Sequence, residues 1–299
     1  MINNVYNDDE RSGAGPSEPD SFDSKRAFQP DDIAVRVISV GGQMLNVAVK
    51  RGAGNRPPLL LFNGIGANWE LARPFLTALA DTTAIIFDIP GVGGSPMRAL
   101  PYRPSSIARL AKELVAELGY ERIDVAGVSW GGGLAQQFAH QYPTICRKLV
   151  LAATSPGAIM VPGSPWVLIK MATPRRYVDR DYMRSIAGEI YGGAFRRNPA
   201  LINGHAAAMG GARGVGYLYQ LLAMVGWTSL PWLWSIRQPT LVMMGREDPL
   251  VPPINGRILA RLIPNAKLEM IDDGHLFLVT RPVECAALIE KFLATDGAG

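Results

Sequence analysis

The chain has 299 residues, 48% of them hydrophobic, and a formal net charge of +4. This length allows about two domains, or one large α/β domain with an insertion. The basic residues are scattered rather than gathered in a stripe, which argues against nucleic-acid binding. Cys146 and Cys285 fit neither a disulfide framework nor a metal-ligand spacing, and we expect two buried free thiols.

The first 30 residues differ in composition from the rest of the chain. Residues 1–30 are polar and acidic and are rich in Asp, Ser, Gly and Pro, so they predict a disordered arm. They lack the apolar segment of a secretion signal. The best candidate for a membrane span, residues 221–236, is interrupted by glycine and proline. We therefore expect an intracellular, soluble protein, or one peripheral to an apolar surface.

Strand and helix patterns alternate along most of the chain. The stretches Ile33–Val40 and Gln43–Val49 flank two glycines and predict an antiparallel hairpin. Continuous apolar runs predict strands buried on both faces of a parallel sheet, at 59–62, 84–87, 123–126, 148–152, 240–244 and 267–271. Helical patterns lie at 72–80, 105–118, 132–141, 255–262 and 283–293. The predicted fold class is α/β, with a mostly parallel central sheet and helices on both faces.

The alternation stops between residues 155 and 238, which hold no clear strand pattern but four tryptophans. We interpret this segment as a helical cap inserted into a core of residues 31–154 and 239–299. Aromatic residues of a cap more often fill its own core than contact a ligand. Trp232 and Trp234 would point to different sides of an extended stretch, so we expect at least one to face the substrate or the granule, and both are candidate substrate-binding residues.

A Gly-x-Ser-x-Gly sequence, residues 127–131, connects a predicted strand to a predicted helix. In this context it is typical of a nucleophile elbow, in which Ser129 sits on a sharp turn beside the unpaired N–H groups of a helix start. Gly127 and Gly131 are expected because a Cβ at either position would crowd the turn. The alternative is a glycine-rich turn with a chance serine.

A serine nucleophile requires a base, and the chain has three histidines. His140 follows Ser129 on the same predicted helix and is expected to be structural, and His205 lies in the predicted cap. His275 follows the strand at 267–271, and sites gather at the carboxyl ends of parallel strands. The chain order serine, acid, histidine therefore favours His275 as the base.

The acid should follow a strand between the serine and the histidine. Asp248 follows the strand at 240–244 and is preferred to Glu247, because the turn brings it back toward the sheet edge. Its role would be to orient His275 and to stabilise the imidazolium. The alternative is an exposed aspartate in a turn before proline.

Two backbone N–H groups are candidates for an oxyanion hole. One belongs to Trp130, directly after the serine, and the other to Ile65, in the loop after the strand at 59–62. Asn63 opens that loop; it either braces the loop by hydrogen bonding or is a turn residue without a direct role. We count it as a candidate substrate-binding residue. No metal or organic cofactor is expected.

The order of strands, elbow, acid and base resembles the α/β-hydrolases from about residue 33 to 293. Five stretches together resemble the intracellular medium-chain-length poly(3-hydroxyalkanoate) depolymerases of pseudomonads: 63–68, 127–132, 135–140, 191–197 and 272–278. The resemblance implies that Ser129 is the nucleophile, Asp248 the acid and His275 the base. It also implies a cytoplasmic protein associated with storage granules. The polar arm is the main departure from that family.

The resemblance implies ester hydrolysis of this polyester through an acyl-enzyme, with release of 3-hydroxyalkanoic acids or oligomers. The expected partners are the hydrophobic polyester and the granule surface. Two alternatives stay open, because fold does not fix function. One is a small-molecule carboxylesterase or C–C bond hydrolase of the same fold, and the other is a non-catalytic granule-binding protein. The sequence does not decide the oligomeric state.

Overall fold

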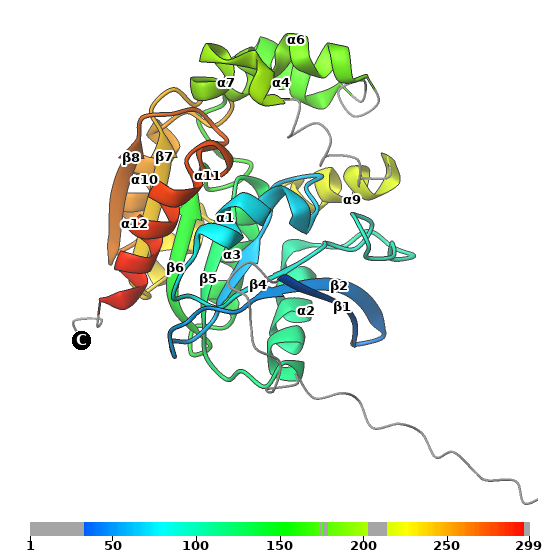
Figure 1. Cartoon of the computed structure of the whole chain (residues 1–299), viewed down its shortest axis with the longest axis vertical. Helices are drawn as coiled ribbons and strands as arrows, with labels where there is room; N and C mark the ends of the chain where they lie inside the picture. Colours follow the sequence, from blue (N-terminus) through cyan, green and yellow to red (C-terminus); the bar gives the residue numbers. More distant parts are fainter. Residues whose placement is uncertain (1–32, 174, 176–178, 203–213, 296–299) are drawn as a thin grey trace, which may run out of the picture.

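The computed structural model describes residues 33–173, 175, 179–202 and 214–295 (Figure 1). The predicted arm, residues 1–30, and His205 lie outside the described residues. Within them, eight strands form one sheet in the order β1-β2-β4-β3-β5-β6-β7-β8. The strands are β1 (Ile33–Val40), β2 (Gln43–Lys50), β3 (Leu59–Phe62), β4 (Ala84–Phe87), β5 (Ile123–Val128), β6 (Cys146–Ala152), β7 (Thr240–Gly245) and β8 (Ala266–Ile271).

The pairing of the strands confirms the predicted fold class. β2 pairs antiparallel with β1 and β4, and the remaining pairs are parallel. The predicted hairpin is therefore present and joins the parallel part of the sheet through β2. Each predicted strand lies within two residues of an observed one at either end, which is the usual uncertainty of element boundaries.

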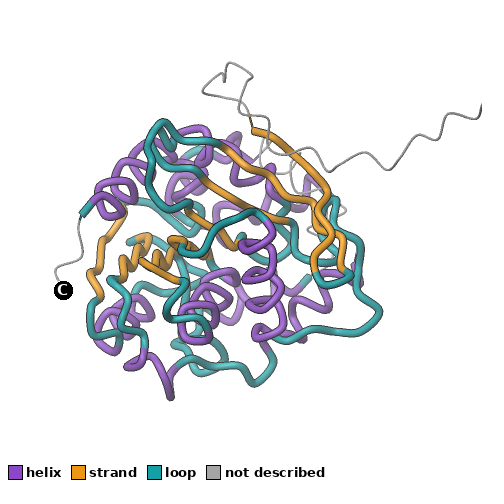
Figure 2. Tube along the Cα trace, turned by 90° about the horizontal axis from the view of Figure 1, so that it is seen from below, coloured by secondary structure: helices purple, strands orange, loops and turns teal. Residues whose placement is uncertain are grey.

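Helices cover both faces of the sheet, as the view from below shows (Figure 2). One face carries α1 (Arg73–Ala78), α11 (Phe277–Thr280) and α12 (Pro282–Ala294), and the other carries α2 (Pro104–Glu117), α3 (Trp130–Gln141) and α10 (Ile254–Leu262). Each set packs its apolar side chains on the sheet to form a separate core. Apolar residues buried between two helical layers explain why the central strands read as continuous apolar runs.

The edge strand β8 differs from its prediction. All residues of β3, β4 and β7 are buried, but in β8 the side chains of Lys267 and Glu269 are exposed while their neighbours are partly buried. The expectation that 267–271 is buried on both faces is therefore wrong. β8 is the last strand of the sheet, so one of its faces stays open to solvent.

The segment predicted as a cap, residues 155–238, lies between β6 and β7. Its described part contains α4 (Pro165–Ala172), α6 (Arg180–Tyr191), α7 (Gly193–Arg197), η2 (Pro199–Leu201), α9 (Gly214–Met224) and η3 (Leu230–Ser235). Figure 1 shows α4, α6 and α7 stacked beyond the sheet, with α9 nearer to the core. In these described residues we find one isolated bridge, Gly157 to Thr228, and no strand. We call residues 155–238 the cap segment.

The end of the cap segment also differs from its prediction as an extended stretch. Residues 230–235 form a 3₁₀ helix, not an extended stretch. Trp232 stacks on His140 with ring centroids 4.3 Å apart, while Trp234 is 62% exposed. The two indoles follow the three-residue turn of this helix rather than the alternation of a strand. No helix of the described residues is long and apolar enough to cross a membrane.

Candidate active site

Ser129 lies on the turn between β5 and α3 with φ 53° and ψ −118°. This region of positive φ is rarely adopted by residues other than glycine. Neighbouring groups hold the turn: the Ser129 N–H donates to the Ala152 carbonyl at 2.8 Å, and the Thr154 hydroxyl donates to the Ser129 carbonyl at 2.7 Å. Backbone strain that is over-determined in this way is typical of functional sites.

The two glycines of the motif are required by close contacts. A Cβ on Gly127 would lie 2.3 Å from the carbonyl oxygen of Gly131, and a Cβ on Gly131 would lie 2.2 Å from that of Phe62. The expectation of crowding is confirmed at both positions. The second clash involves the neighbouring strand β3, so Gly131 lets the start of α3 approach the sheet.

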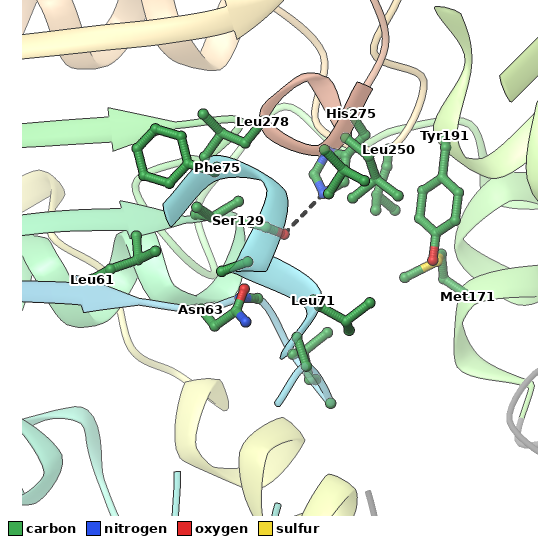
Figure 3. Close-up of a pocket in the computed structure, with 18 residues that line it drawn as sticks. Leu61, Asn63, Leu71, Phe75, Ser129, Met171, Tyr191, Leu250, His275 and Leu278 are labelled. Atoms are coloured by element: carbon green, nitrogen blue, oxygen red, sulfur yellow. Dashed lines mark hydrogen bonds between the residues drawn. The ribbon is translucent and has the colours of Figure 1, made fainter. Parts of the chain in front are cut away.

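The structure brings Ser129, His275 and Asp248 into one chain of hydrogen bonds, and Figure 3 shows the link between Ser129 and His275. Ser129 Oγ lies 3.0 Å from His275 Nε2, and His275 Nδ1 lies 2.8 Å from Asp248 Oδ2. A carboxylate can only accept, so Nδ1 carries the imidazole proton and Nε2 can accept the serine proton. This is the geometry that the base and its orienting acid require.

Asp248 is fixed by its own turn. Its Oδ1 accepts the N–H groups of Leu250 and Val251, each at 2.9 Å, and both Asp248 and His275 are buried. Glu247, the other acid in this loop, forms an ion pair with Arg197 instead. The distinction between the two carboxylates made from the sequence therefore agrees with their placement.

The loop that carries His275 is attached to the cap segment. The N–H of His275 donates to the Tyr191 carbonyl at 2.7 Å. The Asp273 carboxylate accepts from the Thr280 hydroxyl and from the N–H groups of Gly274 and Ala194, at the start of α7. Burial opposes ionisation of Asp273, but these hydrogen bonds outweigh it and hold the pKa of Asp273 below its ordinary value. Hydrogen bonds to both the core and the cap segment thus hold the loop of His275 in place.

The predicted oxyanion donors lie beside the serine. Ile65 and Ser129 line the same cavities, and Trp130 opens α3. Among the described residues, neither the Ile65 N–H nor the Trp130 N–H donates to a protein acceptor. Asn63 braces the loop: its Oδ1 accepts from Gly64 N–H at 2.9 Å and its Nδ2 donates to the Asn68 carbonyl at 2.7 Å.

Two apolar cavities meet at Ser129. The α1 cavity, of about 90 Å³, is lined by Leu61, Leu71, Phe75, Leu278 and Val279. The α9 cavity, of about 380 Å³, is lined by Met160, Leu168, Tyr217, Leu221, Met224 and Trp227. Ser129, Ile65, Met171 and Leu250 border both. In Figure 3, Phe75 and Leu278 lie on one side of the serine and Met171 and Tyr191 on the other.

The tryptophans predicted to bind substrate are not brought to this site. Neither Trp232 nor Trp234 lines either cavity, whereas Trp227 lines the α9 cavity and donates from its indole to Gln137. Asn63 does line the α1 cavity. Sequence reasoning did not single out Trp227 for this site, because its only signal was a place in the cap segment. In the described residues, no three His, Cys, Asp or Glu side chains are grouped to hold a metal ion.

Comparisons with known proteins agree with this architecture. A family model described as the alpha/beta hydrolase fold matches residues 57–282. The poly(3-hydroxyalkanoate) depolymerase of Ectopseudomonas oleovorans is 52% identical over 268 residues, which cover 89% of this chain and 95% of that protein. The pimeloyl-[acyl-carrier protein] methyl ester esterase of Aromatoleum aromaticum is 31% identical over 255 residues, covering 79% of this chain and 98% of that protein.

A solved structure shares the fold at lower sequence similarity. The enol-lactonase from Burkholderia xenovorans LB400 superposes with a TM-score of 0.75 at 22% identity, covering 87% of this chain and 100% of that one. At this identity the likeness shows the fold alone.

Proposed function

This chain belongs to the alpha/beta hydrolase family, and we propose that it hydrolyses the ester bonds of intracellular medium-chain-length poly(3-hydroxyalkanoates). The observation that carries the proposal is a hydrogen-bonded Ser129, His275 and Asp248 at the meeting point of two apolar cavities. The 52% identical poly(3-hydroxyalkanoate) depolymerase of Ectopseudomonas oleovorans supports a poly(3-hydroxyalkanoate) as the substrate.

The proposed reaction runs through an acyl-enzyme. Ser129 Oγ attacks the ester carbonyl while His275 Nε2 accepts its proton, and the N–H groups of Ile65 and Trp130 stabilise the oxyanion. His275 then protonates the leaving alkoxide, which departs as a free hydroxyl end. A water molecule, deprotonated by the same imidazole, attacks the acyl carbonyl. The bond to Ser129 Oγ then breaks, the imidazolium returns the proton to that oxygen, and a 3-hydroxyalkanoic acid or oligomer is released. Asp248 holds the imidazole tautomer throughout.

The two cavities favour a substrate with apolar groups on both sides of the scissile bond. In a poly(3-hydroxyalkanoate), each ester is flanked by one alkyl side chain on the acyl side and one on the alcohol side. Two apolar cavities that share Ser129 provide one space for each. A methyl ester would leave one of them empty.

An exposed apolar surface of the cap segment supports attachment to the polymer granule. Large apolar side chains point to solvent from α4 (Trp166, Leu168, Ile169) and from α9 (Val215, Leu218, Leu221, Leu222). Leu168 and Leu221 also line the α9 cavity, so this surface borders the route to Ser129. Exposed apolar patches of this kind mark contacts with other apolar material. We call these seven residues the cap surface.

The experiment that tests the substrate compares three assays on the purified chain. It measures acid release from amorphous medium-chain and short-chain polyester granules and hydrolysis of a soluble p-nitrophenyl ester. We expect the medium-chain granules to be degraded faster than the short-chain ones. Activity confined to the small ester would contradict the depolymerase proposal and favour a small-molecule esterase. A fluorophosphonate probe that fails to label Ser129 would favour a non-catalytic binding protein.

A further inference from the structure

Helix α9 of the cap segment contacts both halves of the proposed oxyanion hole through one residue. Gln220 is fully buried. Its side-chain Oε1 accepts the N–H of Gly66 at 2.7 Å, and its backbone carbonyl accepts the indole N–H of Trp130 at 2.9 Å. Gly66 follows Ile65 directly, so a single residue of α9 is bonded next to one proposed donor and to the side chain of the other.

We propose that Gln220 is a positioning residue for the oxyanion hole, fixing the loop of Ile65 and the start of α3 relative to each other. The inference rests on the proposed function, because it assigns a role to the hole used in ester hydrolysis. Gln220 lines neither cavity, so its effect on the reaction passes through Ile65 and Trp130.

The hydrogen bonds of residues 64–67 show why this acceptor matters. The N–H of Gly64 bonds to the Asn63 side chain, and that of Ala67 bonds to the Gly64 carbonyl. The N–H of Gly66 has its acceptor on α9. The remaining N–H, that of Ile65, stays available for the substrate. Fixing the plane of the peptide between Ile65 and Gly66 also limits rotation at Ile65, and therefore limits the direction in which its N–H points.

The backbone of α9 is seated closely enough to fix Gln220. A Cβ on Gly216 would lie 2.0 Å from the carbonyl oxygen of Gly91, so the helix lies directly against the loop after β4. Gln220 is four residues later and therefore lies on the same helix face. This backbone contact seats the helix, whereas the hydrogen bond from the Tyr219 hydroxyl to the Ala99 carbonyl, at 3.3 Å, is solvent-exposed. The oxyanion hole is consequently complete only while α9 is seated.

The test replaces Gln220 with methionine, which has similar length but offers the Gly66 N–H only a weak thioether acceptor in place of the amide oxygen. Removing one oxyanion donor costs about 10²–10³ in rate. A donor that is misdirected should cost less, so we expect kcat for a soluble p-nitrophenyl ester to fall by about tenfold to 100-fold with KM little changed. Affinity for an aryl trifluoromethyl ketone, whose adduct with Ser129 places an oxyanion in the hole, should fall by a similar factor.

Tyr219→Phe is the matched control, because it removes an adjacent bond between α9 and the core but leaves the oxyanion loop untouched. We expect it to keep kcat and the ketone affinity. Trp130→Phe keeps the backbone N–H but removes the bond to the Gln220 carbonyl. It should lower kcat less than Gln220→Met, and the double variant should lose less than the product of the two effects. This second route applies even if Gln220→Met does not fold.

The outcomes separate this inference from the proposed function. If Gln220→Met keeps kcat and ketone affinity, or if Tyr219→Phe loses as much as Gln220→Met, the positioning role is wrong. If the parent chain hydrolyses the soluble ester but not the polymer, the depolymerase proposal fails while the test of Gln220 still stands. The positioning role would also be wrong if Gln220→Met lowered kcat and raised KM by similar factors while its affinity for the ketone stayed unchanged.

Discussion

The loops at the strand ends and the cap segment hold the same site by different means. The strand-end loops supply the side chains of the proposed catalytic triad: Ser129 after β5, Asp248 after β7 and His275 after β8. The cap segment supplies backbone carbonyls, a buried amide and cavity walls, through Tyr191, Gln220 and the residues of the α9 cavity. Under the proposed function, the chemistry depends on the strand-end loops, and alignment and substrate shape depend on the cap segment.

Mutations in the strand-end loops and in the cap segment should have different effects on the kinetics. Changes at the strand ends should lower the rate for every ester by a similar factor, because each substrate uses the same bond-making groups. Changes in the cap segment should separate one substrate from another, or kcat from KM, because they act on fit and alignment.

The largest effects should come from the partners of the serine. His275→Gln and Asp248→Asn remove the proton acceptor and its orienting group, and we expect losses on the order of 10⁴ or more in kcat, with the aspartate variant the less affected. Polymer and soluble ester should lose alike, as measured by initial rates on both substrates. A variant with either change that lost activity on only one substrate would break the assignment of chemistry to the strand ends.

A smaller effect is expected from the cap surface. Replacing Trp166 and Ile169, which are 73% and 58% exposed, with serine removes apolar contact with an insoluble substrate. We expect granule hydrolysis at limiting enzyme to fall about tenfold, since burial of large apolar side chains contributes about 1.5–3 kcal/mol each when complete. Hydrolysis of the soluble ester should not change.

Val283→Ser is the control for that pair. Val283 is also 73% exposed, but it lies on α12, outside the cap segment. It should leave granule hydrolysis unchanged. Equal losses in the control and the cap-surface variant would show that the location of the apolar side chains does not matter, contrary to the proposal.

The smallest expected effect is on stability, at Asp273, which bonds the loop of His275 to the cap segment. Because the pKa of Asp273 is held below its ordinary value in the folded chain, its ionised form stabilises the fold above the unfolded pKa, and this stabilisation is lost as pH falls through the folded pKa. Asp273→Asn should lower the free energy of unfolding by about 1–3 kcal/mol at pH 7. The difference from the parent should shrink on acidification, as measured by urea denaturation. A difference that does not depend on pH would contradict the role of the charge.

The fold and the strand-end residues could be predicted because their signals are local. A buried parallel strand is a short apolar run, and Ser129, Asp248 and His275 each follow one in the chain order of this family. The preference for Asp248 over Glu247 agrees with the structure because turn geometry at the end of β7 is also local. The catalytic roles of these residues stay predictions until the variants are measured.

The remaining features depend on tertiary packing. Gln220 contacts Gly66, 154 positions away in the chain, and no local pattern indicates which face of α9 meets the core. The expectation that Trp232 and Trp234 lie on an extended stretch was wrong, because residues 230–235 follow the period of a 3₁₀ helix, not that of a strand. The burial of β8 was overestimated because its position at the sheet edge is set by the order of all eight described strands.

The most direct test of the proposed reaction at Ser129 measures acid release from amorphous medium-chain-length poly(3-hydroxyalkanoate) granules. It compares the parent chain with Ser129→Ala. The parent should release 3-hydroxyalkanoic acids or oligomers. The folded Ser129→Ala variant should still bind the granules but release acid more slowly than the parent by about 10⁴-fold or more. Release by Ser129→Ala at a rate close to that of the parent would contradict the role of Ser129 as the nucleophile.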